Sequence, residues 1–170
     1  MGPLVRRSWQ PRGRTPILHQ RGRSLEKVSA IAALCVSPRR DQVRLYFRLH
    51  PKAEIDALRV IGFLRPLNQE LNAPCVLLWD RLNAHRAKRT AQFVEGVDHL
   101  HTFFLPAYAP ELNPVEYAWG YLKMNPLANR PAFETKELAA LTHRHARSLQ
   151  SNEPLLRSFL RHSPLFLRLR

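Results

Sequence analysis

The sequence has few cysteines and no long apolar run, and each shortage excludes a class of protein. Cys35 and Cys75 stand in apolar stretches without a zinc-type cysteine or histidine partner, so we interpret them as small buried side chains in a reducing compartment. No run approaches the roughly 18 apolar residues of a membrane span, and the basic start lacks the apolar stretch of a signal peptide. We therefore predict a cytoplasmic protein that does not bind a membrane.

Acidic residues are also scarce, and the imbalance of charge indicates a partner. The chain has 13 Asp and Glu against 27 Lys and Arg, which gives a net charge of +14. Such an excess favours a polyanion, because each neutralised phosphate releases counterions. Nucleic acid is the favoured partner, and a ribosome-like or merely basic surface is the alternative. With 45% hydrophobic residues in 170, the chain can build one compact domain around a core.

The distribution of charge and proline divides the chain into three parts. Residues 1–24 contain six Arg, no acid and three prolines, which predicts a basic extended arm; a disordered tail is the alternative. Residues 25–125 alternate between strand and helix patterns and form the predicted core. Residues 126–170 form a predicted C-terminal helical extension.

The apolar periodicity predicts an α/β domain. An unbroken apolar run indicates a strand at residues 28–36, strict alternation indicates a half-exposed strand at 43–50, and two short strands follow at 75–79 and 101–105. Helices are predicted at residues 52–71, 85–96, from 114 onwards, 134–149 and 153–162. The order is therefore β-β-α-β-α-β-α-α-α.

Two of these helices are predicted in more detail. In residues 52–71, Pro66 is expected to kink or end the helix because proline has no backbone N–H to donate. The inward face of that helix is expected to carry Ile55, Leu58, Ile61 and Leu64. Residues 85–96 are expected to form a single basic helix. Its inward side chains are Ala87, Ala91 and Val94, and its outward ones are Arg86, Lys88 and Arg89.

Asp80 is the first candidate for chemistry. It follows an apolar strand directly, so its carboxylate would be held just outside the core at the end of a strand, where α/β domains gather their working groups. Carboxylate oxygen is a ligand that a hard divalent cation requires. The alternative is an Asp that forms a turn or caps the next helix. Asn83 and His85 could orient a metal-bound water or a phosphate, although a helix-entry role fits them equally.

Glu116 is the second candidate. The preceding loop carries three prolines, Asn113 is a good N-cap, Pro114 suits the first helical position, and Glu116 comes three residues after the cap. The arrangement is close to a capping box, in which Glu116 would bond back to the backbone of Asn113. A carboxylate in a proline-braced first turn is also a well-placed metal ligand. Other histidines lack acidic or cysteine companions at zinc-ligand spacing.

The segments VLLWDRLNAHRA and FFLPAYAPELNPVEYAWGYLK resemble two blocks of the DDE transposases of the mariner-type superfamily, in its bacterial insertion-sequence branch. In that family a W-D-x-x-x-x-H block supplies the second catalytic acid and a Y-x-P-x-L-N-P-x-E block the third. Between Asp80 and Glu116 lie 35 residues, as the family's DD(34–35)E pattern requires. The likeness spans about residues 5 to 125, because RRSWQPRGRTP resembles the segment after the first acidic block.

This resemblance implies a ribonuclease-H-like fold, in which a mixed sheet is flanked by helices, and a transposase that cleaves and joins DNA with Mg²⁺ or Mn²⁺. It makes Asp80 and Glu116 catalytic metal ligands, with Asn83, His85 and Asn113 in supporting roles. DNA, both transposon ends and target, becomes the expected partner, with no small-molecule substrate, a nucleoid location and a homodimer on paired ends. The expected DNA contacts are Arg12, Arg14, Arg86, Lys88 and Arg89.

The resemblance also implies that a part is missing. The family's first Asp lies on its first strand, shortly before the basic arm, and no acid in this sequence replaces it by motif. We expect a catalytic-domain fragment that lacks the first strand and acidic block and the preceding helix-turn-helix region. Two ligands are not expected to hold two ions against their mutual repulsion, so the fragment would be inactive alone. The alternatives are a non-catalytic DNA-binding or regulatory module, and a ribonuclease-H-like nuclease that uses other acids.

Overall fold

A computed structural model of the chain describes residues 7, 9, 11–14, 17, 27–129, 134–165 and 168–169. Most of the predicted basic arm, residues 1–24, lies outside them. Within the described residues the elements follow the predicted order, except that one predicted helix is two. The three-part division of the chain stays a prediction.

The first two strands form an antiparallel hairpin. β1 (Val28–Val36) pairs with β2 (Val43–Pro51) along its whole length, with Val36 opposite Val43 at the turn. The Ser37 hydroxyl oxygen accepts the backbone N–H groups of Asp41 and Gln42, each at 3.1 Å. Arg40 has a φ of 60°, and its N–H donates to the Ser37 carbonyl at 2.8 Å, which tightens the turn.

The other two strands form a parallel pair. β3 (Cys75–Trp79) lies beside β4 (Leu100–Phe104), and two short helices, α2 (Asn83–Arg86) and α3 (Lys88–Glu95), make the crossover between them. In the part of the chain that the structure describes, each strand has one partner, so the predicted mixed sheet is present as two small sheets. Their flanking helices confirm the α/β class.

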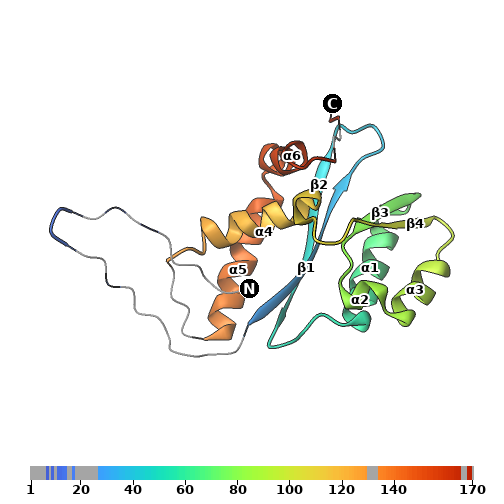
Figure 1. Cartoon of the computed structure of the whole chain (residues 1–170), viewed down its shortest axis with the longest axis horizontal. Coiled ribbons are helices and arrows are strands. Elements are labelled where there is room, and N and C mark those ends of the chain that lie inside the picture. Colours follow the sequence, from blue (N-terminus) through green and yellow to red (C-terminus); the bar gives the residue numbers. More distant parts are fainter. Residues whose placement is uncertain are drawn as a thin grey trace.

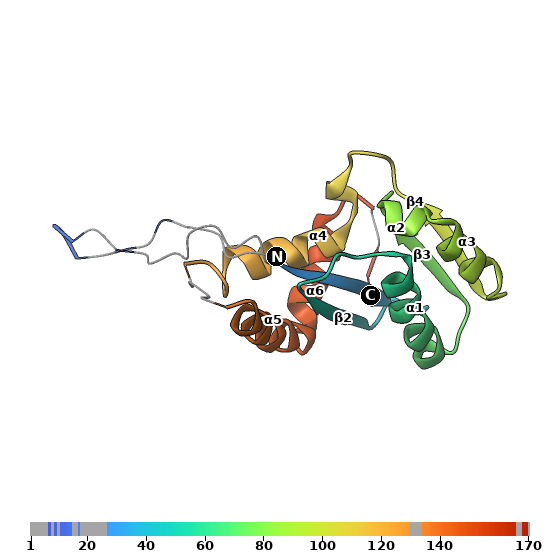
Figure 2. The ribbon, with the colours of Figure 1, turned by 90° about the horizontal axis from the view of Figure 1, so that it is seen from below.

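The hairpin lies between two groups of helices (Figures 1 and 2). On one side are α1 (Ala57–Leu71), α2, α3 and the β3–β4 pair; on the other are α4 (Pro114–Met124), α5 (Thr135–Gln150) and α6 (Glu153–His162). Because successive strand residues face opposite ways, β1 contributes to two apolar clusters. The cluster with α4, α5 and α6 receives Ala32, Leu34 and Val36, and the cluster with α1 and Trp79 receives Ile31, Ala33 and Cys35.

The prediction that Pro66 ends its helix is wrong, because α1 continues through it to Leu71, while a kink at Pro66 stays a prediction. A proline at this position cannot donate to the carbonyl of Gly62, four residues earlier. That carbonyl instead accepts the Arg48 guanidinium from β2, with 2.8 Å between Nη1 and O. The strand therefore supplies the donor that the proline lacks, while the Pro66 ring itself is exposed.

The predictions that Leu58 and Ala91 face inward are also wrong. Leu58 is 61% exposed, because α1 begins at Ala57 and its buried side is set by Val60, Phe63, Leu64 and Leu67. Ala91 is exposed, because the chain is extended at Ala87 and the predicted 85–96 helix divides there into α2 and α3. Thr90 occupies the inward position with no exposure, and its hydroxyl donates to the Ala84 carbonyl at 2.7 Å.

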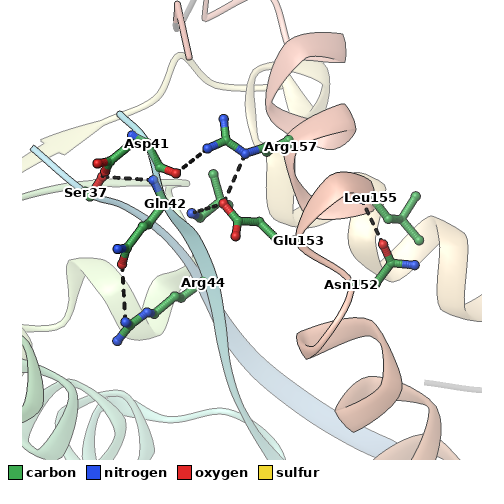
Figure 3. A network of polar contacts seen from close by, with 9 residues as sticks. Ser37, Asp41, Gln42, Arg44, Asn152, Glu153, Leu155 and Arg157 are labelled. Carbon is green, nitrogen blue, oxygen red and sulfur yellow. Dashed lines mark hydrogen bonds and ion pairs between the residues drawn. The ribbon is translucent and has the colours of Figure 1, made fainter. Parts of the chain in front are cut away.

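The C-terminal helix is tied to the hairpin turn by the polar network in Figure 3. The Glu153 carboxylate accepts the backbone N–H of Val43 at 3.1 Å and the Arg157 Nε at 3.0 Å. Arg157 in turn donates to the carbonyl of Asp41. A carboxylate that accepts two donors while bridging 110 positions of sequence fixes α6 against the start of β2.

Candidate metal and DNA site

Asp80 lies directly after β3, where sequence reasoning placed it. The Trp79 carbonyl just before it accepts the N–H of Leu105 at 2.8 Å, and Arg81 Nε just after it donates to the Leu105 carbonyl at 3.2 Å. Asp80 is therefore held at the point where the ends of β3 and β4 are joined by two hydrogen bonds.

The Asp80 carboxylate is asymmetric. Its Oδ1 accepts the N–H of Leu82 at 3.0 Å and lies 2.8 Å from Nδ1 of His85. The hydrogen bond from His85, together with the bond from Leu82, holds the pKa of Asp80 below its ordinary value, although partial burial opposes this. Oδ2 has no hydrogen-bond partner among the described residues. An ionised carboxylate with one free oxygen at its half-exposed end is suited to a cation.

His85 is fixed by an aromatic stack. Its ring lies parallel to that of Trp79, with 4.8 Å between centroids and 14° between planes, and Trp79 stacks on Phe104 at 5.7 Å. The His85 side chain is only 17% exposed. Sequence reasoning named His85 but missed Trp79, which is buried at 7% exposure and faces the α1 cluster. Its place before Asp80 in an alternating strand was the available signal.

Glu116 lies in the first turn of α4, as predicted. The loop before it forms a 3-10 turn, η1 (Pro110–Leu112), and Asn113 caps α4 by accepting the N–H of Val115 on Oδ1 at 3.2 Å. The reciprocal half of a capping box is missing, because the N–H of Asn113 donates to Pro110 instead, at 3.0 Å. Glu116 is exposed, and its carboxylate makes no hydrogen bond or ion pair to the described residues.

The structure brings together some of the predicted residues and not others. Asp80 and His85 are in contact, and Asn113 supports the turn that carries Glu116. Asn83 begins α2 and is exposed, and no hydrogen bond joins it to Asp80 among the described residues. Among the described residues, no group of three His, Cys, Asp or Glu, and so none that contains both Asp80 and Glu116, is placed to hold a metal. Their joint role as metal ligands stays a prediction.

The predicted DNA contacts are all exposed cations. Arg86 ends α2, and Lys88 and Arg89 begin α3, so the three lie within ten residues of Asp80 on the same crossover. Arg12 and Arg14 lie in a turn closed by the Arg14 N–H, which donates to the Pro11 carbonyl at 3.1 Å. No acid neutralises these cations through an ion pair in the described part of the chain. Their contact with DNA stays a prediction.

A protein-family model and several solved structures resemble this chain. The family model described as "DDE superfamily endonuclease" matches residues 2–139, which is well over half of the chain. The chain belongs to the DDE endonuclease superfamily. This finding confirms the resemblance drawn from the segments around Asp80 and Glu116. No curated protein matches the sequence closely enough to be counted as a relative.

Solved structures agree on the fold. The Mos1 mariner paired-end complex with Mn is similar with a TM-score of 0.63 at 17% identity, over 95% of this chain and 47% of that one. The Mos1 strand transfer complex gives a TM-score of 0.56 at 16% identity, over 98% of this chain and 52% of that one. The chain thus spans about half the length of these transposase chains, and the likeness shows that it shares their catalytic-core fold.

Among the helices that the structure describes, none is both long and apolar enough to cross a bilayer.

Proposed function

We propose that this chain is a catalytic-domain part of a mariner-type transposase, and that Asp80 and Glu116 supply two of its metal ligands. The family match and the position of Asp80 at the joined ends of β3 and β4 carry this proposal. The reaction would be in-line attack on phosphodiester bonds, first by water and then by a DNA 3′-hydroxyl. The bacterial insertion-sequence branch is part of the proposal, as is a location beside the nucleoid.

The two carboxylates fit a hard divalent cation. Asp80 has one oxygen held by Leu82 and His85 and a second that receives no donor from the described residues, while Glu116 is exposed. Mg²⁺ or Mn²⁺ would, when bound, stabilise the negative charge on the attacking and leaving oxygens. His85, which stacks on the Trp79 ring, occupies Oδ1 of Asp80, so that Oδ2 is the oxygen left for a cation.

We further propose that the chain alone does not cleave or join DNA. Two ions about 3.5–4 Å apart need bridging carboxylates to offset their repulsion. The described residues contain no group of three His, Cys, Asp or Glu side chains placed to hold a metal, and none of Asp41, Glu54 and Asp56 lies in a matching motif. One ion held weakly by two ligands would not complete the reaction.

The partner would be DNA. The net charge of +14 and the exposed cations of α2 and α3 favour phosphate contacts, to which Arg86, Lys88 and Arg89 would contribute beside Asp80. Arg12 and Arg14 would add contacts from the basic arm. The Mos1 complexes contain paired transposon ends, which supports a homodimer for this chain.

A second candidate function is a non-catalytic DNA-binding module, favoured by the same charge excess together with the lack, among the described residues, of a group of three side chains placed to hold a metal. Both readings expect an affinity for DNA that falls with salt. They differ in the effect of Mg²⁺. Under the transposase proposal Mg²⁺ raises the affinity, because the ion offsets the repulsion between two carboxylates and the phosphates, and Asp80→Ala removes that dependence.

The experiment is a combined cleavage and binding assay on the purified chain with plasmid and linear DNA. We expect no cleavage or joining with Mg²⁺ or Mn²⁺, and a Mg²⁺-dependent gain in affinity that Asp80→Ala abolishes. Asp98→Ala, which removes an exposed carboxylate elsewhere, is the matched control. Mg²⁺-dependent strand transfer by the chain, lost in Asp80→Ala, would contradict the proposed inactivity. A DNA affinity indifferent to Mg²⁺ and to Asp80→Ala would favour the module.

A further inference from the structure

The residue that follows α6 contacts the loop that leads to Glu116. Ser163 is buried at 3% exposure, and its hydroxyl donates to the carbonyl of Leu112 across 3.2 Å and 51 positions of sequence. The same oxygen accepts the N–H of Leu165 at 3.5 Å. Because a carbonyl oxygen can only accept, the Ser163 hydroxyl must donate its hydrogen to Leu112, and its oxygen is left to accept the N–H of Leu165.

A second contact holds the neighbouring carbonyl. The Tyr117 hydroxyl donates to the carbonyl of Glu111 at 3.0 Å. The edge of the Tyr117 ring meets the His162 ring, with 5.2 Å between centroids and 89° between planes. Two consecutive carbonyls of the 3-10 turn are therefore held, one by the end of α6 and one by a side chain of α4 that α6 supports.

These contacts bear on Glu116 through the backbone. Leu112 is joined directly to Asn113, whose carbonyl accepts the N–H of Glu116 at 2.9 Å and whose side chain caps Val115. The Glu116 carboxylate has no partner among the residues that the structure describes, so we take its position to follow that of this turn. A ligand must be held to within about 0.5 Å to act on a reacting group.

We propose that Ser163 is a positioning residue, which sets the place of the Glu116 carboxylate by holding the carbonyl of Leu112. The end of α6 is thereby part of the candidate site, although it is far from Glu116 in sequence. This inference rests on the proposed function only for the metal-binding role of Glu116. The restraint, by which we mean the hold of Ser163 on the Leu112 carbonyl, requires no metal.

The restraint is tested by amide hydrogen exchange in the metal-free chain. In Ser163→Ala the part-buried bond to the Leu112 carbonyl is lost, and we expect exchange at Val115 and Glu116 to rise roughly tenfold, with α5 amides unchanged. Ser158→Ala is the matched control, because the Ser158 hydroxyl also donates to a carbonyl, that of Leu155, but on the exposed side of α6. It is expected to leave both amides as in the unaltered chain.

Two further variants separate positioning from general stability. Ser163→Thr keeps the hydroxyl and is expected to restore slow exchange, and Tyr117→Phe, which removes only the bond to Glu111, is expected to raise exchange at the same amides. Unchanged exchange in both Ser163→Ala and Tyr117→Phe would overturn the inference. A uniform rise through the whole chain would also overturn it, because Ser163 would then stabilise the domain without positioning Glu116.

A metal readout distinguishes this inference from the proposed function. With Mn²⁺ added, we expect Ser163→Ala to weaken the paramagnetic broadening of the Glu116 amide relative to that of Asp80, a ratio that a purely stabilising residue would not change. If Mn²⁺ broadens neither amide in the unaltered chain, the proposed metal role fails, while the exchange result still decides on the restraint.

Discussion

The two oxygens of the Asp80 carboxylate have different surroundings, and this difference defines the candidate site at the scale of single residues. His85 and Leu82 hold Oδ1, while Oδ2 and the Glu116 carboxylate receive no donor from the part of the chain that the structure describes. The Trp79 ring keeps His85 in place by stacking. The proposed site thus consists of two carboxylates that can accept a cation, Asp80 after β3 and Glu116 in the first turn of α4.

Asp56 gives a pH dependence that can be measured at one residue. The backbone N–H of Arg59 donates to Oδ1 at 2.9 Å, and this bond, with the Arg59 guanidinium, lowers the pKa of Asp56 below the ordinary 3.8. A carboxylate whose pKa is lowered by folding stabilises the fold above its unfolded pKa, and that contribution is lost as the pH falls through the folded value.

We therefore expect Asp56→Asn, which can still cap α1, to be less stable than the unaltered chain at pH 7. The difference should shrink as the pH falls below 3.8. Urea denaturation of both proteins at pH 7 and in steps below pH 4 measures this. A difference that grows on acidification would show that the charge of Asp56 does not support the helix.

The role of a residue could be predicted from the sequence where it depends on residues nearby in the chain. Asp80, Asn113 and Glu116 could be found because strand ends, caps and motif spacing are local in sequence. The missed capping bond depends on the loop, where Pro110 takes the N–H of Asn113. The role of Ser163 could not be predicted, because its partner is 51 positions away.

At the scale of elements, α1 shows why helix prediction failed at a proline. Pro66 removes a donor, and the local rule expects a break. Arg48 arrives from β2 and satisfies the Gly62 carbonyl, which no pattern within the helix could reveal. The break at Ala87 was missed for a similar reason, since the Ala84 carbonyl is taken by the Thr90 side chain.

A double-mutant cycle tests this replacement of a donor. Arg48→Met keeps the apolar stem and removes the guanidinium, and we expect it to lower the free energy of unfolding by about 1 kcal/mol. In a Pro66→Ala background the loss should be smaller, because the alanine N–H can donate to Gly62. Urea denaturation of the four proteins gives the coupling. Arg44→Met, on the same face of β2, is the control, and equal effects of Arg48→Met in both backgrounds would contradict the account.

At the scale of the whole molecule, β1 joins two separate apolar clusters, and the C-terminal helix joins distant parts of the chain. Through Glu153 and Arg157 the α6 helix holds the hairpin turn, and through Ser163 it holds the loop before Glu116. The sequence predicted α5 and α6 within about one residue, since their periodicity is strong. The contacts of α6 with the hairpin turn and with the loop before Glu116 could not be predicted from the sequence, because they join residues far apart in the chain.

The central claim is that Asp80 and Glu116 bind the same cation. Nuclear magnetic resonance of the isotope-labelled chain during a Mn²⁺ titration tests this most directly, because broadening falls steeply with distance from the ion. We predict that the amides of Asp80 and Glu116 broaden together at the same Mn²⁺ concentrations, and that Asp80→Asn or Glu116→Gln abolishes broadening at both. Broadening centred on His99 and His101, or unchanged in Asp80→Asn, would contradict the account.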